Sequence, residues 1–97
     1  MTVEEKFIEA YCKELGLLWG LQYISLANGK RGFHIKVVDE SGTVQYFFES
    51  CLSEHMTEYV LRRQVARKAV TVLKHAVEKK RDKLWLQQQE LNDYTVL

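Results

Sequence analysis

Proline is absent from this 97-residue sequence, and glycine occurs only five times. Neither residue interrupts the stretch from Met56 to Trp85, so a long helix can form there. No apolar run approaches the roughly 20 residues that span a membrane. The acidic start MTVEEKF does not have the basic and apolar pattern of a signal peptide. We therefore expect an intracellular, cytoplasmic protein that does not enter a membrane.

Cysteine is also scarce, because Cys12 and Cys51 are the only two. Two cysteines are too few for a disulfide framework, and we expect both to be buried free thiols. Cys51 and His55 have a Cys-x₃-His spacing, but no second close pair completes a zinc site. No third group or oxyanion site accompanies a Cys–His pair. We expect no bound metal, no cofactor and no enzymatic activity.

The formal net charge is only +1, but the charges are unevenly distributed. Between Arg62 and Lys83, nine basic residues stand against two acidic ones, a net of +7. Between Thr2 and Glu14, two basic residues stand against four acidic ones, a net of −2. A locally basic segment can bind a polyanion, and it is also what the solvated side of an ordinary helix looks like. Composition leaves both interpretations open.

The first predicted element is a helix from about Val3 to Leu15. Thr2 and Glu5 have the T-x-x-E spacing of a capping box, and Gly16 tolerates the left-handed conformation that ends many helices. We expect the acidic residues of this helix to be solvated. Its apolar residues recur at helical spacing: Val3, Phe7, Ile8, Tyr11 and Leu15.

Three strands are predicted next, over residues 21–27, 33–37 and 43–50. Apolar residues alternate with polar ones in the second strand, and Val38 breaks this alternation. Asn28-Gly29 is a hairpin signal, and the stretch from Asp39 to Gly42 is a turn. Residues 17–19 are expected to pack as the chain turns into the first strand.

The last predicted element is a long helix that begins at Ser53 or Thr57 and continues to about Gln89. The fold class is therefore α+β: a helix, a three-stranded antiparallel sheet and a long C-terminal helix, with both helices on one face of the sheet. The predicted apolar stripe of the long helix is Met56, Tyr59, Val60, Ala66, Ala69, Val70, Leu73, Ala76 and Val77. The predicted shared core is Phe7, Ile8, Tyr11, Leu15, Ile35, Val37, Tyr46, Phe48, Ala66, Val70 and Leu73.

The long helix is too long for the sheet. It would run about 50 Å, whereas a seven-residue strand spans roughly 23 Å. We therefore divide the chain into a domain over residues 1–83 and a C-terminal helix extension and tail over residues 84–97. The extension carries Leu84, Trp85, Leu86 and Leu91, which are candidates for an interface with a partner protein or a second copy. The alternative is that the helix folds back and Trp85 caps the core.

The order helix–strand–strand–strand–helix, with a basic second helix, resembles the double-stranded RNA-binding domain. The segment from Arg63 to Val70, RQVARKAV, is similar to the family's pattern Lys-Lys-x-Ala-Lys-x-x-Ala-Ala. The family's Gly-Pro-x-His loop motif and the Gly-x-Gly ending of its third strand are missing here. The resemblance implies that the first helix and the loop from Asn28 to Gly32 enter successive minor grooves of duplex RNA. It implies phosphate contacts from Arg63, Arg67 and Lys68, with Lys30 and Arg31 on the loop.

Two functions are thus predicted. The first is a nucleic-acid-binding module that binds double-stranded RNA through its phosphates. The second is a protein-interaction module, such as a small adaptor, dimer or inhibitor, that uses the C-terminal helix.

Overall fold

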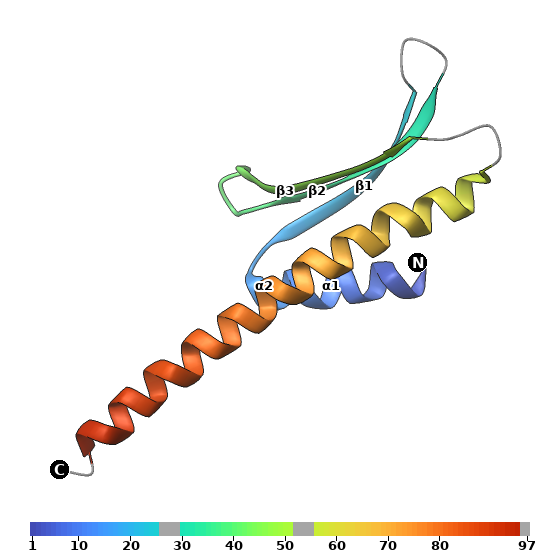
Figure 1. Cartoon of the computed structure of the whole chain (residues 1–97). Coiled ribbons are helices and arrows are strands. Elements are labelled where there is room, and N and C mark those ends of the chain that lie inside the picture. Colours follow the sequence, from blue (N-terminus) through green and yellow to red (C-terminus); the bar gives the residue numbers. More distant parts are fainter. Residues whose placement is uncertain (26–29, 52–55, 96–97) are drawn as a thin grey trace.

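The computed structural model describes residues 1–25, 30–51 and 56–95, with side chains as far as Glu90. It contains two helices and a three-stranded antiparallel sheet, so the predicted α+β fold is confirmed (Figure 1). None of the helices in this described part is both long and apolar enough to cross a membrane. The elements in chain order are α1 (Val3–Leu15), β1 (Leu18–Ser25), β2 (Arg31–Val38), β3 (Val44–Cys51) and α2 (Glu58–Thr95).

Helix α1 begins and ends where its local signals predict. The N–H of Glu5 donates to the Thr2 hydroxyl at 3.2 Å, and the N–H of Thr2 donates to the Glu5 carboxylate at 2.6 Å. These two bonds form the capping box and satisfy N–H groups that the first helical turn leaves unpaired. Gly16 ends the helix at φ 71°, a left-handed conformation that glycine adopts without steric cost.

The sheet has the order β1-β2-β3, with β2 in the centre. Strand β1 begins at Leu18, three residues before the predicted start, because Leu18 and Trp19 pair with the end of β2. The predicted end of this strand and the Asn28-Gly29 hairpin signal lie outside the described residues. Strand β2 begins two residues before the predicted start and also extends to Val38. The register shifts between Val37 and Val38, where the apolar alternation breaks.

The turn predicted after β2 is present, and the carboxylate of Asp39 holds it. Asp39 accepts hydrogen bonds from the N–H groups of Ser41 and Thr43, both at 2.9 Å. Gly42 lies in the same turn at φ 87°. These bonds hold the pKa of Asp39 below its ordinary value, with the Ser41 hydroxyl as the main donor.

Helix α2 begins at Glu58, and the Thr57 hydroxyl accepts a bond from the N–H of Val60 at 3.2 Å. Thr57 is therefore the cap, while the alternative, Ser53, lies outside the described residues. The helix continues to Thr95, past the predicted end near Gln89. Its first half lies against the sheet, and its second half projects beyond the rest of the molecule (Figure 1).

Both helices lie on the same face of the sheet, as predicted, and they run side by side (Figure 1). Helix α1 lies next to the edge strand β1, whereas α2 covers β2 and β3. The core between these layers consists of Ile8, Cys12, Phe33, Ile35, Val37, Leu61, Val65, Ala66, Ala69 and Leu73. Of the predicted core, Tyr11, Leu15, Tyr46, Phe48 and Val70 are partly buried against this cluster.

The predicted apolar stripes are partly wrong, because some of their residues lie one position away from the residues that are buried. Tyr59 and Val60 are 61% and 49% exposed, whereas Leu61 and Val65 are fully buried. The buried stripe of α2 advances in four-residue steps from Leu61, and a position one residue away lies about 100° around the helix. In α1, Phe7 is 48% exposed for the same reason, because Glu5, Ile8 and Cys12 take the inward positions.

Candidate interaction surfaces

The basic face of α2 lies against the acidic side of α1. Arg63 Nη2 lies 2.8 Å from Oε1 of Glu4, and Arg67 Nε lies 3.3 Å from the same oxygen. The bonds from Arg63 hold the pKa of Glu4 at about 2, against an ordinary 4.5. Two guanidinium groups therefore converge on one carboxylate, and the charges of α1 and α2 neutralise each other where the helices meet.

A second, partly buried ion pair lies beside the first. Arg62 Nε donates to Glu5 Oε1 at 2.6 Å, and Arg62 Nη2 donates to Oε2 at 3.1 Å. The Glu5 side chain is 1% exposed and that of Arg62 is 39% exposed. Burial raises the pKa of Glu5, but the bonds from Arg62 and Thr2 outweigh it and leave the pKa below its ordinary value. The expectation that the acidic residues of α1 are solvated is thus wrong for Glu5, which helical spacing turns inward, and for Glu4, whose side chain is 13% exposed.

The end of α1 is joined to α2 in a similar way. Arg81 makes two bonds to the Glu14 carboxylate, at 2.7 and 2.8 Å, and these bonds lower the Glu14 pKa. The ammonium group of Lys80 donates to the Glu14 carbonyl oxygen at 2.5 Å. Ion pairs therefore hold α1 along α2 from its first turn to its last.

The five residues predicted to contact phosphates lie on different parts of the fold. Arg63 and Arg67 face α1, whereas Lys68 lies on the other side of α2 and donates to the Glu49 carbonyl oxygen of β3 at 3.4 Å. Arg31 is 3.8 Å from Glu58, so the start of β2 lies beside the start of α2, with Lys30 next to it in the chain. The structure thus brings Arg63 and Arg67 together and places Lys68 apart from them.

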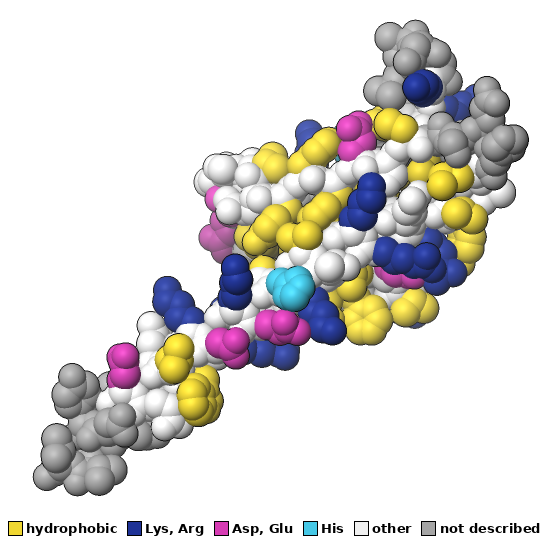
Figure 2. Space-filling model, in the orientation of Figure 1, with side chains coloured by type: hydrophobic (Ala, Val, Ile, Leu, Met, Phe, Trp, Pro, Cys, Tyr) yellow, Lys and Arg dark blue, Asp and Glu magenta, His cyan; other side chains and the backbone are white. Residues whose placement is uncertain are grey.

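The C-terminal half of α2 is a helical arm, which we define as residues 78–95. All described side chains of the arm are exposed, as Figure 2 shows for one face. Leu84, Trp85 and Leu86 are 50%, 58% and 56% exposed. The alternative in which Trp85 caps the core is therefore wrong, because the helix continues straight past the sheet. The side chain of Leu91 lies outside the described residues.

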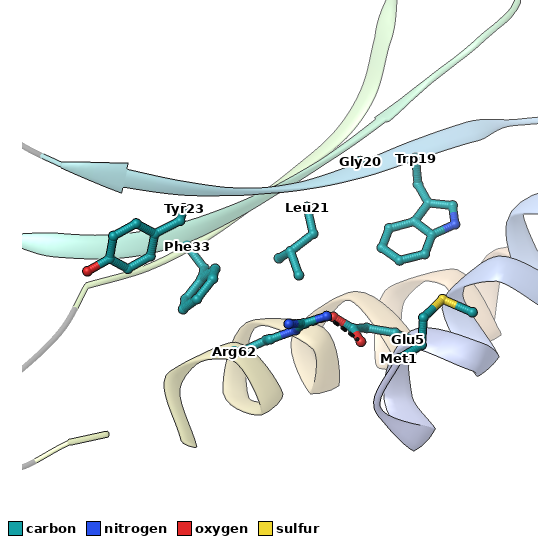
Figure 3. A pocket seen from close by; sticks show the side chains of 8 residues that line it. All are labelled: Met1, Glu5, Trp19, Gly20, Leu21, Tyr23, Phe33 and Arg62. Carbon is teal, nitrogen blue, oxygen red and sulfur yellow. Dashed lines mark hydrogen bonds and ion pairs between the residues drawn. The ribbon is translucent and has the colours of Figure 1, made fainter. Parts of the chain in front are cut away.

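An open pocket of about 400 Å³ lies between β1 and the two helices (Figure 3). Trp19 and Leu21 point from β1 toward the helices, and the Glu5–Arg62 pair faces them. The other lining residues are Met1, Gly20, Tyr23 and Phe33. This pocket is not among the predicted sites, because Trp19 was expected to lie before the first strand. Continuing the period-two alternation back from Leu21 would have put Trp19 on the face that meets the helices.

The described residues offer neither a cluster that could bind a metal ion nor a reactive thiol at Cys12. No three His, Cys, Asp or Glu side chains among them are arranged to hold a metal ion. Cys12 is buried as predicted, and burial raises its pKa to about 11, so it remains a thiol. Cys51 is exposed, contrary to the prediction, because it falls on the sheet face turned away from the helices. His55 lies outside the described residues, and the absence of enzymatic activity stays a prediction.

Comparison of the chain with models of known protein families, with curated proteins and with solved structures found no match.

Proposed function

We propose that this protein is a protein-interaction module whose docking element is the helical arm of α2. The observation that carries the proposal is the exposure of Leu84, Trp85 and Leu86 on a helix that has left the body of the domain. Large apolar side chains on a projecting helix are typical of a surface that a partner covers, and Trp is enriched at the energetic centres of interfaces.

The ion pairs of α2 support docking through apolar side chains over binding of a polyanion through charge alone. Arg62, Arg63 and Arg81 each form short ion pairs with α1, so much of the basic segment is neutralised within the domain. A polyanion would have to compete with these pairs. An apolar partner surface covering Trp85 would leave all of them intact.

Photo-crosslinking in cells tests the proposal. We would replace Trp85 with the photoreactive residue p-benzoylphenylalanine, and in a matched control replace Gln64, which is exposed on the body of α2. We expect a protein adduct from position 85 and not from position 64. Equal or absent adducts at the two positions would contradict the proposal.

Removing residues 84–97 supplies a second test. The shortened chain should keep its melting temperature, because the deleted side chains that are described make no core contact, and its helical circular dichroism signal should fall only by the removed turns of α2. It should also lose the complexes that the full chain forms. A large drop in melting temperature would indicate that the arm supports the core.

We propose binding of double-stranded RNA as a second candidate function. The observation that favours it is the convergence of Arg63 and Arg67 on one oxygen of Glu4, which is how two guanidinium groups would hold a phosphate oxygen. The Arg67 side chain is 64% exposed, and among the described residues Lys68 bonds a carbonyl oxygen and pairs with no carboxylate. Duplex RNA is recognised through such contacts along one face.

This candidate makes a prediction that depends on Glu4. If phosphate binds at Arg63 and Arg67, Glu4→Gln should tighten binding to duplex RNA, because it removes a competing anion. The double change Arg63→Ala and Arg67→Ala should weaken binding to all duplex sequences and lower the salt slope by about one for each lost phosphate contact. Absence of duplex binding by the unchanged protein at low salt would exclude the candidate.

A further inference from the structure

We propose that the outer edge of β3 binds an extended segment of another protein as an additional strand, and that this segment has an acidic side chain on either side of an apolar one. The surface lies on the body of the domain, so the proposal goes beyond the function of the helical arm and does not rest on it. Three observations carry it: the direction of the backbone groups of β3, a groove between β3 and α2, and the positions of two lysines.

The outer edge of β3 presents a row of backbone groups, which is a template for a further strand. The sheet order is β1-β2-β3, so no strand in the described part of the chain lies beyond β3. The Ser50 carbonyl oxygen lies so close to Gly32 of β2 that a Cβ atom there would overlap it. The Glu49 carbonyl oxygen instead accepts a bond from Lys68 of α2. Because successive residues of a strand turn their N–H and C=O groups to opposite edges, Phe47 and Glu49 present theirs outward.

A groove of about 490 Å³ lies beside this edge, between β3 and α2. Its lining residues are Tyr46 of β3 and Val72, His75, Ala76 and Lys79 of α2. Figure 2 shows hydrophobic side chains between the sheet and this face of α2, with basic side chains beside them. A strand added to β3 would extend the sheet over the groove. Every second side chain of that strand would therefore point onto Val72 and Ala76.

Lys68 and Lys79 flank the centre of the groove. They are eleven residues apart, about three turns, so they lie on one side of α2 with Val72 between them. Their separation along the helix is about 16 Å, and residues i and i+4 of a strand are about 13 Å apart, a difference that lysine side chains can span. Acidic side chains at i and i+4 would thus meet the two lysines, and an apolar side chain at i+2 would cover Val72.

The charges around the groove support this acidic pattern. His75 Nδ1 lies 3.6 Å from Glu78 Oε2, whereas among the described residues neither lysine pairs with a carboxylate. The Lys68 contact with the Glu49 carbonyl oxygen is long, at 3.4 Å. A lysine at the edge of a sheet discourages pairing with unselected strands. An acidic segment would convert the same lysine into a binding partner.

The same features disfavour β3 of a second copy as the added strand. Two β3 edges paired about a two-fold axis would bring the lysines of both α2 helices together. The side chains of β3 that face the helices include Tyr46, Phe48 and Ser50, and none of these is acidic. The strand is therefore expected to come from a different protein.

Fluorescence anisotropy with synthetic peptides tests the proposal on the full chain. The probe is a labelled peptide, TTETVTETT, whose glutamates and valine occupy positions i, i+2 and i+4. In the control peptide, lysine replaces both glutamates. We expect the chain to bind the probe and not the control. Absence of probe binding up to about 1 mM, or equal binding of the two peptides, would overturn the proposal.

Variants of α2 locate the binding site. Lys68→Glu and Lys79→Glu should each weaken probe binding about fivefold or more, because they place like charges together. Val72→Glu should abolish it. Lys74→Glu is the matched control, since Lys74 is exposed on the opposite side of α2, and it should bind like the unchanged chain. An equal loss in the Lys74 variant would contradict the assignment of the groove.

Backbone methylation distinguishes an added strand from attraction between charges alone. Alternate residues of a strand turn their N–H groups to the same edge. One peptide carries N-methyl groups on both glutamates and the valine, and a second carries them on the three threonines that follow these residues. We expect one of the two peptides to lose binding and the other to keep it. Equal effects of the two methylations would overturn the strand addition.

Two further measurements separate this proposal from its alternatives. Sedimentation velocity without peptide should show no dimer that the probe dissociates. Such a dimer would mean that a second copy occupies the edge, and it would overturn the proposal. Trp85→Ala should bind the probe like the unchanged chain, because Trp85 lies on the arm and not in the groove. Failure of the arm as a docking element and failure of the β3 edge are therefore distinguishable.

Discussion

Glu5 of α1 and Arg62 of α2, which are 57 residues apart, share two hydrogen bonds between a buried carboxylate and a guanidinium group. The same carboxylate accepts the Thr2 N–H in the capping box. One side chain therefore starts α1 and fixes it to α2. Removal of one partner of such a pair costs more than the pair contributes, because the other charge stays buried without a counter-ion.

The first prediction follows from that pair. Arg62→Ala should lower the free energy of unfolding by about 2–4 kcal/mol, because Glu5 remains buried while the exposed side of Arg62 limits the loss. Lys74→Ala, at an exposed position of the same helix, should change it by less than about 0.5 kcal/mol. Urea unfolding of both variants checks this. Equal effects would show that the Glu5–Arg62 pair contributes no more than an exposed lysine.

The second prediction compares two glycines. A Cβ atom at Gly32 would lie 2.4 Å from the carbonyl oxygen of Ser50 on the neighbouring strand, whereas one at Gly20 meets nothing within 4 Å. Gly32→Ala must therefore displace backbone and should cost about 1–3 kcal/mol or more. Gly20→Ala should be neutral or stabilise by up to about 1 kcal/mol, through the unfolded state. Thermal unfolding followed by circular dichroism distinguishes the two.

The third prediction concerns the core stripe of α2. Leu73 is fully buried and the adjacent Val72 is 38% exposed. Leu73→Ala should cost about 2–5 kcal/mol because it removes buried apolar surface and leaves a cavity. Val72→Ala should cost less than about 1 kcal/mol. Chemical denaturation measures the free energy of unfolding of both variants. Similar losses for the two would mean that α2 turns a different side toward the sheet.

The fourth prediction is a loss of stability in acid. The folded pKa of Glu4 is about 2, below its ordinary 4.5, because Arg63 stabilises the charged form. A group with a lowered folded pKa contributes its full stabilisation above its unfolded pKa, and loses it as the pH falls through the folded value. The unfolding free energy should therefore decline between about pH 4.5 and pH 2.

Glu4→Gln provides the control for this prediction. Its stability deficit relative to the unchanged chain should be constant near neutral pH and should shrink as Glu4 becomes protonated. Urea unfolding at pH 7, and at several values below about 4.5, measures the difference. A deficit that stays constant down to the lowest pH would mean that the Glu4–Arg63 pair does not form in solution.

The sequence by itself determined the features that arise from bonds between near neighbours or from chain length. The capping box of Thr2 and Glu5, the end of α1 at Gly16 and the turn at Asp39 all depend on contacts within a few residues. The break in pattern at Val38 marked the irregularity in the sheet. The overhang of α2 followed from comparing the length of a helix with the length of a strand.

The tertiary structure alone decided which side of each helix is covered, and by what. Apolar spacing located the stripe of α2 to within about one residue, but that residue separates exposed Val60 from buried Leu61. The pairing of Glu4 with Arg63 joins positions 59 residues apart, and no local pattern records it. Charges that a sequence presents as a free basic face are therefore about half neutralised once α1 docks, whereas Trp85 stays exposed because no other element in the described part of the chain reaches it.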